Sequence, residues 1–475
     1  MANLLATLRS SADAMGVYQK ALEVTQSNLG NASTPGYARQ RLTLLPRVFD
    51  PWDGMAGGVA AGPVVSSRDD VAESNVRRQV EGQGKSNTQA ELLAGVEEAL
   101  PVDAGAGIAS ALTGLMRSFS NWSLTPNDVN ARQSVLDNAG TLAQSFQDTA
   151  QALTDASRSA EQQLGDTVDK INTLTASLRD YNAEARRGTR GDAGLDARVQ
   201  STLEDLAELV DFTAIPQEDG SVTVLAGNSV PLVIGDRQYS LHLDFATPPG
   251  AAYPDGPAPA CILDDNGADV TGRFTGGRLG GALDLRNQVI PGLIGDTSQQ
   301  GQLNQLASTL ADRVNTILGD GWTADGATPP ENLFVYNADN ATASARTLAV
   351  NPSFAPEMLA ATDPGPPYVS NGTALKLASL AQSQDPADRI DGAGFLQYYS
   401  GLAAAVGRRT ADAQQSADLQ GQFVAQARSL RSETQGVSLD EEAVTVIEFQ
   451  RAYQAAAQMI TVLNELTQTA VDLLK

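Results

Sequence analysis

The most regular pattern of hydrophobic and polar positions lies in residues 436–475. After Gly436 the chain contains no further glycine or proline, so nothing interrupts a helix there. Ser438 stands at the expected N-cap, and Glu441 three residues later completes the pattern of a capping box. Apolar or small side chains then recur three and four residues apart, as in a helix that packs against a partner helix. The principal positions are Val446, Phe449, Tyr453, Ile460, Leu463 and Leu474.

A second apolar stripe flanks this seam. It consists of Met459, Leu466 and Leu473, so one partner helix leaves apolar surface uncovered. A single amphipathic helix in an ordinary core is the alternative interpretation, and it requires no assembly.

Residues 3–29 show the same period, and Gly30 follows as a helix stop. The apolar positions are Leu4, Leu8, Met15, Tyr18, Leu22 and Leu29. We therefore expect the two ends of the chain to pair as a parallel or antiparallel coiled coil. The seams are rich in Ala, Ser, Thr and Tyr, so such a pair is marginal in water until neighbouring molecules cover it. This weakness indicates polymerisation.

The remaining pattern predicts a mainly α fold with a β insertion. The longest helical stretch covers residues 128–187 and would reach about 90 Å, although Gly165 marks a potential break. We expect paired terminal helices in 1–50 and 436–475, which form an assembly domain. A long α-helical rod domain would use 51–210, 277–320 and 371–435, with 321–370 an irregular, loop-rich segment.

Residues 211–276 have a different sequence pattern. Short runs of residues that favour β-strands are separated by turn dipeptides such as Asp219-Gly220 and Gly235-Asp236. They predict a small β domain that leaves and re-enters the helices through glycine-rich hinges. On that basis we expect this domain to be dispensable for assembly.

Composition excludes several classes of function. A formal net charge of -24 argues against nucleic acid or an anionic membrane as a partner. The chain has no run of about 20 apolar residues, and its start has neither a basic nor an apolar signal region. One cysteine and one histidine exclude a disulfide framework and the usual histidine-based metal clusters.

No catalytic, cofactor or metal site is predicted. His242 alternates with leucines in an expected strand, which favours a solvent-facing side chain over a catalytic base. The run 264–269 hints at a calcium loop but has Ala268 at a ligand position, so a hairpin turn is favoured. Cys261 fits a small apolar filler better than a nucleophile.

Two motifs lie beside the terminal helices. The first, before a short strand-like run, consists of Asn28, Leu29, Asn31, Thr34, Gly36, Tyr37, Arg39 and Gln40. It resembles the signature of bacterial flagellar rod, hook and hook-associated proteins, where it follows the N-terminal helix. Residues 436–442 and 449–457 resemble the other end of the same family. Residues 127–136, 218–222, 277–287 and 303–315 are more similar to the hook-associated subfamily at the hook–filament junction.

The resemblance implies a structural subunit of the flagellum that joins hook to filament, with no enzymatic activity and no cofactor. It implies terminal helices in an inner tube, a middle rod domain and a β domain facing outward. Expected partners are further copies in a ring or short helical layer, the hook protein on one side, and a second junction protein and the filament on the other. An export chaperone would bind the C-terminal region, and the chain would reach the cell exterior by type III export without a cleaved signal peptide.

Other functions remain as alternatives. A hook or distal rod subunit is disfavoured by the helical middle, 128–210 and 303–318. A flagellum-associated cell-wall hydrolase would need a carboxylate-lined cleft in a compact domain. An extracellular adhesin that uses the β insertion is the third alternative.

Overall fold

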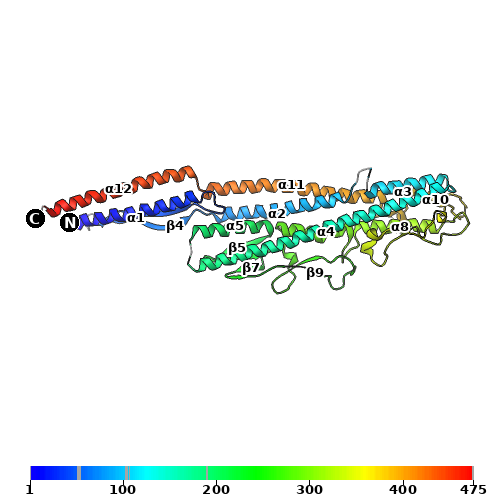
Figure 1. Cartoon of the computed structure of the whole chain (residues 1–475), viewed down its shortest axis with the longest axis horizontal. Helices are drawn as coiled ribbons and strands as arrows, with labels where there is room; N and C mark the ends of the chain where they lie inside the picture. Colours follow the sequence, from blue (N-terminus) through cyan, green and yellow to red (C-terminus); the bar gives the residue numbers. More distant parts are fainter. Residues whose placement is uncertain (1, 51–54, 102–104, 106, 189–190, 473–475) are drawn as a thin grey trace.

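The computed structural model describes residues 2–50, 55–101, 105, 107–188 and 191–472, which form an elongated, mainly helical molecule (Figure 1). Both termini lie at one end, remote from the larger helical part. The helices are α1 (Ala2–Gly30), α2 (Asp70–Glu98), α3 (Gly107–Leu124), α4 (Val129–Arg186), α5 (Ala193–Leu209), α6 (Gly277–Asp284), α7 (Ile290–Ile294), α8 (Gln302–Gly319), α9 (Ser344–Thr347), α10 (Gly372–Ser379), α11 (Phe395–Gln435) and α12 (Leu439–Asp472). The fold class predicted from the sequence is confirmed.

The strands form small antiparallel sheets. β1 (Gln40–Pro46) pairs with β4 (Val59–Ser66), and β2 (Phe49–Asp50) pairs with β3 (Met55–Ala56); we call these four strands the ribbon. The largest sheet has the order β5 (Phe212–Pro216), β6 (Val222–Ala226), β7 (Val230–Ile234) and β8 (Arg237–Gln238). The remaining strands are β9 (His242–Phe245) with β10 (Ala260–Leu263), β11 (Phe334–Val335) with β12 (Ala349–Val350), and β13 (Arg389–Ile390) with β14 (Ala393–Gly394).

Helix α4 is the backbone of the rod domain. Its 58 residues, about 87 Å long, run through Gly140 and Gly165 without interruption. One glycine costs about 1 kcal/mol in a helix. Apolar side chains on both sides of Gly165, among them Leu153, Leu164 and Ile171, are completely buried, and their packing outweighs that cost.

The return of the chain from the β layer is helical rather than a loose glycine hinge. α6 continues through a π-helical turn, Leu285–Val289, directly into α7. Pro291 at the start of α7 lacks a backbone N–H, and a π turn is one way to accommodate the missing helical hydrogen bond.

The β layer of residues 211–276 is fused to α4 rather than separate from it. Val224, Leu232 and Ile262 belong to the same buried core as the apolar face of α4. Asn182 donates from Nδ2 to the carbonyl oxygens of Val222 and Gly235 at 2.8 Å, and accepts from the Val222 N–H at 2.8 Å. Asn172 bonds both backbone groups of Leu241 in the same way, at 2.9 Å. The expectation of a separate, hinged domain is therefore wrong, and the shared core argues against the layer being dispensable, because its removal uncovers the core face of α4.

Replacing residues 211–276 by a Gly/Ser linker should destabilise the rod domain. The exposed face of α4 would include Val168, Ile171 and Leu178, and burying a side chain of this size stabilises by about 1.5–3 kcal/mol. Circular dichroism melting of the purified chain should show a lower Tm, and export should fall. An unchanged Tm would show that the layer adds no stability.

Glu81 of α2 lies at the point where the β layer joins the rod domain, close to Asp211 and Gly276. Burial and then the Asp211 carboxylate raise the pKa of Glu81 above its ordinary value of 4.5, partly opposed by Arg78 and Lys85. A carboxyl group with a raised folded-state pKa contributes stability below its unfolded pKa and loses that contribution as pH rises through the folded value. Glu81→Gln should therefore melt above the wild type at pH 7, and the difference should shrink towards pH 4. A lower Tm of Glu81→Gln at pH 7 would contradict this account.

Candidate assembly site

The two terminal helices pair in an antiparallel arrangement (Figure 1). The rings of Tyr18 and Phe449 lie 6.4 Å apart between centroids, and Leu463 is the deepest apolar residue of α12. Val446, Tyr453 and Ile460 are half-buried on the same face as Phe449 and Leu463. The α12 seam expected from the sequence therefore lies on the side that packs against α1, whereas Leu474 lies outside the described residues. We call α1 and α12 the terminal pair.

The buried face of α1 is displaced from the expected seam. Leu4, Leu8, Met15, Tyr18, Leu22 and Leu29 are half-buried, but the most buried positions are Val17, Ala21, Thr25 and Asn28. The reason is that α1 packs against the ribbon as well as against α12. The deepest face consequently lies between the two contacts.

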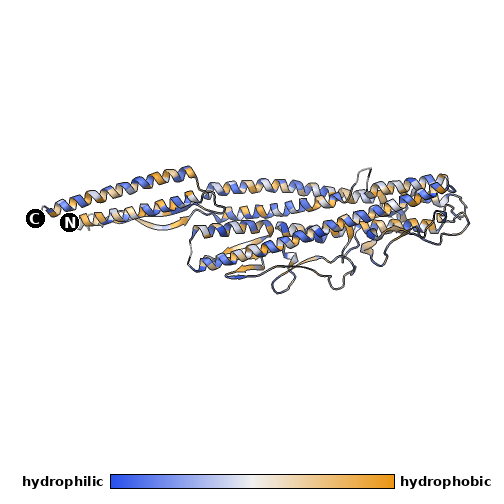
Figure 2. Ribbon diagram, viewed as in Figure 1, coloured by the Kyte–Doolittle hydropathy of each residue, from blue (hydrophilic) through white to orange (hydrophobic). Residues whose placement is uncertain are grey.

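An apolar stripe of α12 remains uncovered by the described part of the chain. Figure 2 shows hydrophobic positions along both terminal helices. Five large side chains are about half exposed, and we call them the outer stripe: Val444, Ile447, Met459, Val462 and Leu466. Met459 and Leu466 were expected there from the sequence, and Leu473 lies outside the described residues. This uncovered surface is what a polymerising helix offers to a neighbour.

The two sequence motifs meet where the terminal pair joins the rod domain. We call this region the neck: residues 28–40, 67–73 and 431–442. Asn28 is 1% exposed, and both ends of its amide are satisfied. Its Nδ2 donates to the Gln40 carbonyl at 2.9 Å and to Glu442 Oε2 at 3.0 Å. Its Oδ1 accepts from the Gln40 N–H at 2.9 Å and from the Tyr37 hydroxyl at 3.0 Å.

Arg39 fixes the start of α12. Its Nη1 lies 3.0 Å from Glu441 Oε2, and its Nε lies 2.6 Å from Glu442 Oε1, without the alignment of a hydrogen bond. Glu442 is 1% exposed, so its charge depends on these partners. Burial, opposed by a Ser27 hydrogen bond, and then the Glu442 charge raise the pKa of Tyr37, which keeps its hydroxyl as a donor to Asn28.

A second charged cluster ties the neck to the rod domain. Glu73 is buried and lies 2.5 Å from Arg68 Nη1 and 3.0 Å from Arg431 Nη1. It also accepts from Gln435 Nε2 at 2.6 Å, and Gln435 Oε1 accepts from the Asp69 N–H at 2.8 Å. The end of α11 is thereby attached to the start of α2. Arg68 and Arg431 extend this cluster to α5 through ion pairs with Asp196 and Glu204.

The remaining motif residues shape the turn between α1 and β1. Asn31 donates to the Ser27 carbonyl at 2.9 Å, and Thr34 donates to Asn31 Oδ1 at 3.2 Å. Gly36 has a φ of 72°, and a Cβ there would lie 2.3 Å from the Ala197 carbonyl oxygen of α5. A glycine is therefore required for the turn to pack on α5.

Sequence reasoning missed the charged partners of these motifs. Glu442 was included only as the last residue of the motif at 436–442, and Glu73, Arg68 and Arg431 were not singled out. The available signal was the opposite sign of Arg39 and the Glu441-Glu442 pair, but hundreds of residues separate them.

The residues considered for chemistry lie on the paired strands β9 and β10 and in the turn that follows β10, with His242 opposite Leu263 and Cys261 opposite Asp244. His242 is exposed on β9, and residues 264–269 form the expected turn, with Asp264 Oδ1 accepting from the Asn266 and Ala268 N–H groups at 2.9 Å. Burial and then Asp269 raise the pKa of Cys261. Within the described residues, no group of three or more His, Cys, Asp or Glu could hold a metal ion. None of the helices in that part of the chain is long and apolar enough to cross a membrane.

Comparison with known proteins identifies the family. A family model described as "Flagellar hook-associated protein FlgK helical domain" matches residues 93–334, half of the chain. The chain belongs to the FlgK family of flagellar hook-associated proteins. A model described as "Flagellar basal body rod FlgEFG protein C-terminal" matches residues 420–473, which include α12. The FlgK match covers the helical middle, where the resemblance to the hook-associated subfamily was expected.

Individual FlgK relatives extend over nearly the whole chain. "Flagellar hook-associated protein 1" of Bacillus subtilis is 24% identical and covers 98% of this chain and 97% of the relative. The protein of that name from Escherichia coli is also 24% identical, with 98% and 99% covered. The flagellar hook junction protein FlgK from Burkholderia pseudomallei has a similar fold, with a TM-score of 0.63, 16% identity, and 76% of this chain and 100% of that chain covered. These relatives are flagellar proteins, and none of their names is that of an enzyme.

Proposed function

We propose that this chain is a structural subunit of the bacterial flagellum that joins the hook to the filament. The observation that carries the proposal is the neck, in which two motifs 414 residues apart meet through Asn28 and Glu442 in a chain of the FlgK family. A subunit built this way presents a continuous helical body rather than a catalytic cleft. Its role is to be bound by other flagellar proteins at both ends.

The subunit associates with further copies in a ring or short helical layer. The outer stripe supports this, because its five side chains lie on one side of α12 and the described residues leave them about half exposed. The hook protein lies on one side of the layer, and a second junction protein and the filament lie on the other.

The chain reaches the cell exterior by flagellar type III export. An export chaperone binds the C-terminal region before export. The exposed Val444, Ile447 and Leu466 support this, because an apolar stripe of this length promotes aggregation inside the cell.

A labelled copy in intact flagella tests the function. In a strain that lacks the chain, the tagged wild type should restore attached filaments, and gold labelling should fall between hook and filament. Without the chain, filament subunits should accumulate in the medium. Label along the whole filament, or attached filaments in its absence, would contradict the proposal.

The terminal pair should be the least stable part of the isolated subunit. Only Leu463 and Glu442 of α12 are buried within its described residues, so few contacts oppose local unfolding. Limited proteolysis should remove roughly the first 50 and last 40 residues and leave the rod domain intact. Mass spectrometry of the fragments would check this, and termini as resistant as the rod domain would refute it.

A further inference from the structure

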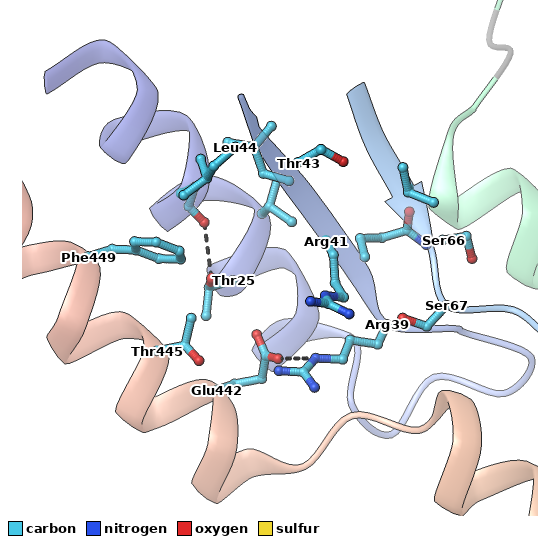
Figure 3. A pocket seen from close by; sticks show the side chains of 15 residues that line it. Thr25, Arg39, Arg41, Thr43, Leu44, Ser66, Ser67, Glu442, Thr445 and Phe449 are labelled. Atoms are coloured by element: carbon cyan, nitrogen blue, oxygen red, sulfur yellow. Dashed lines mark hydrogen bonds and ion pairs between the residues drawn. The ribbon is translucent and has the colours of Figure 1, made fainter. Parts of the chain in front are cut away.

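A groove opens between the ribbon and the terminal pair (Figure 3). Its volume is about 710 Å³, and its walls come from α1, the start of α12 and both long ribbon strands. Phe449 and Thr445 project into it from α12, and Arg39 and Arg41 project towards it from the strand side. Six consecutive residues, 39–44, line the groove. Because consecutive side chains of a strand point to opposite faces, the groove runs along the edge of β1 rather than over one face of the strand.

The strand edge along this groove is incompletely paired. Both backbone groups of Gln40 point away from β4 and are satisfied by the Asn28 amide at 2.9 Å. The backbone carbonyl of Arg39, which points to the other side, accepts from the Ser67 N–H at 2.8 Å. Because an antiparallel strand alternates in this way, the N–H and C=O of Leu42 face the same free edge as those of Gln40. The Asn28 amide thus pairs with the backbone groups of Gln40. The next backbone groups along the same edge, those of Leu42, are open to a further strand.

The outer part of the same ribbon, residues 47–50, carries large exposed apolar side chains, and we call it the tip. Val48 and Phe49 are 72% and 71% exposed, among the most exposed large apolar side chains of the chain. The tip is held against the outer part of α1, where Ser10 donates to the Gly57 carbonyl at 2.8 Å and Arg47 pairs with Asp13 at 2.5 Å. The groove lies at Ala21, Val24 and Thr25 of α1. Tip and groove of one chain are thus about 20 Å apart along the helix, and the tip cannot fill its own groove.

We propose that the groove receives the ribbon tip of a second copy, residues Arg47–Asp50. The backbone of the incoming segment continues the ladder at Leu42, and Phe49 covers the apolar walls formed by Leu42, Leu44 and Phe449. A two-stranded ribbon is marginal alone, and a third strand completes it. Arg41 lines the groove and has no ion-pair partner within the described residues, so its positive charge attracts a carboxylate of the incoming copy.

This contact determines how copies are arranged. Each copy offers one tip and one groove, so the contact is head-to-tail and repeats without limit or closes into a ring. Neighbours must be displaced along the helix axis by about 20 Å, the separation of tip and groove in one chain. The inference rests on the proposed function and adds the residues and the stagger of its self-association.

Cysteine cross-linking in assembled flagella tests the contact. Cys261→Ser removes the one native thiol, and Phe49→Cys with Thr445→Cys then places one thiol on the tip and one in the groove. Mild oxidation should produce a ladder of multiples of the 49.6 kDa chain. Co-expressed single variants should give a heterodimer only. The matched control replaces Phe49→Cys by Leu124→Cys, an exposed leucine at the far end of the rod domain, and should give no ladder.

Phe49→Glu provides a second readout. It should abolish attached filaments while the monomer melts like the wild type, because Phe49 is exposed; Leu124→Glu should leave filaments attached. Normal filaments with Phe49→Glu, or no ladder although the cysteine variant lies between hook and filament, would overturn the inference. A wild-type chain found elsewhere than between hook and filament would overturn the proposed function, and the inference would fall with it.

Discussion

Glu442→Ala should release α12 from the neck and leave the rod domain folded. The substitution removes the carboxylate that Asn28 and Arg39 share and leaves the Arg39 charge with the exposed Glu441 alone. Arg39 is about a quarter exposed, so water limits the penalty to on the order of 2–3 kcal/mol. Hydrogen exchange of the α12 amides should accelerate roughly 30- to 150-fold. Filaments should no longer stay attached to the hook.

Glu441→Ala is the matched control for this experiment. Glu441 is next in sequence and also pairs with Arg39, but its side chain is 66% exposed. A surface ion pair of this kind contributes about 0–1 kcal/mol, so exchange should change little. Equal effects of the two substitutions would show that the buried contact has no special importance.

Ile460→Asp and Val462→Asp should both abolish attached filaments, for different reasons. Ile460 lies on the face of α12 that packs against α1, together with Leu463, so a charge there costs several kcal/mol and separates the terminal pair. Val462 belongs to the outer stripe and is 49% exposed, so a charge there leaves the pair intact and blocks the neighbour. Helicity of the monomer by circular dichroism should fall for Ile460→Asp and stay unchanged for Val462→Asp.

Asn464→Asp serves as the control for both variants, since Asn464 is exposed and already polar. The melting transition of the rod domain should remain that of the wild type in all three proteins. Unfolding of the rod domain by Ile460→Asp would show that α12 belongs to one ordinary core. In that case the terminal pair would not be a separate assembly element.

The regular spacing of apolar residues was sufficient to predict the helices, because the buried face of a helix depends on residues close together in the sequence. The apolar face of α4 and the seam of α12 both follow from residues three and four positions apart. The capping box was only half correct for the same reason. Ser438 Oγ accepts from the Glu441 N–H at 3.4 Å, but the Glu441 carboxylate turns to Arg39 instead of completing the box.

Contacts between distant segments could not be predicted in this way. The buried face of α1 is shifted because α1 packs against the ribbon as well as against α12, and nothing within α1 itself encodes the ribbon. The β layer looked independent because its turns and glycines are visible in the sequence. Its hydrogen bonds to Asn172 and Asn182 are not, since asparagine on a helix is usually solvated.

Helices α2 and α11 pack side by side and run antiparallel (Figure 1), which has a consequence for the order in which the chain folds. Asn28 and Glu442 are 414 residues apart, and closing so long a loop directly is slow and entropically costly. Once α2 and α11 are aligned, Asp69 and Gln435 already lie together. The segments that must still come together to pair α1 with α12 are then only a few tens of residues long. We therefore expect the rod domain to condense first and the terminal helices to close last. A subunit that arrives unfolded becomes able to bind its neighbours only after its middle is complete.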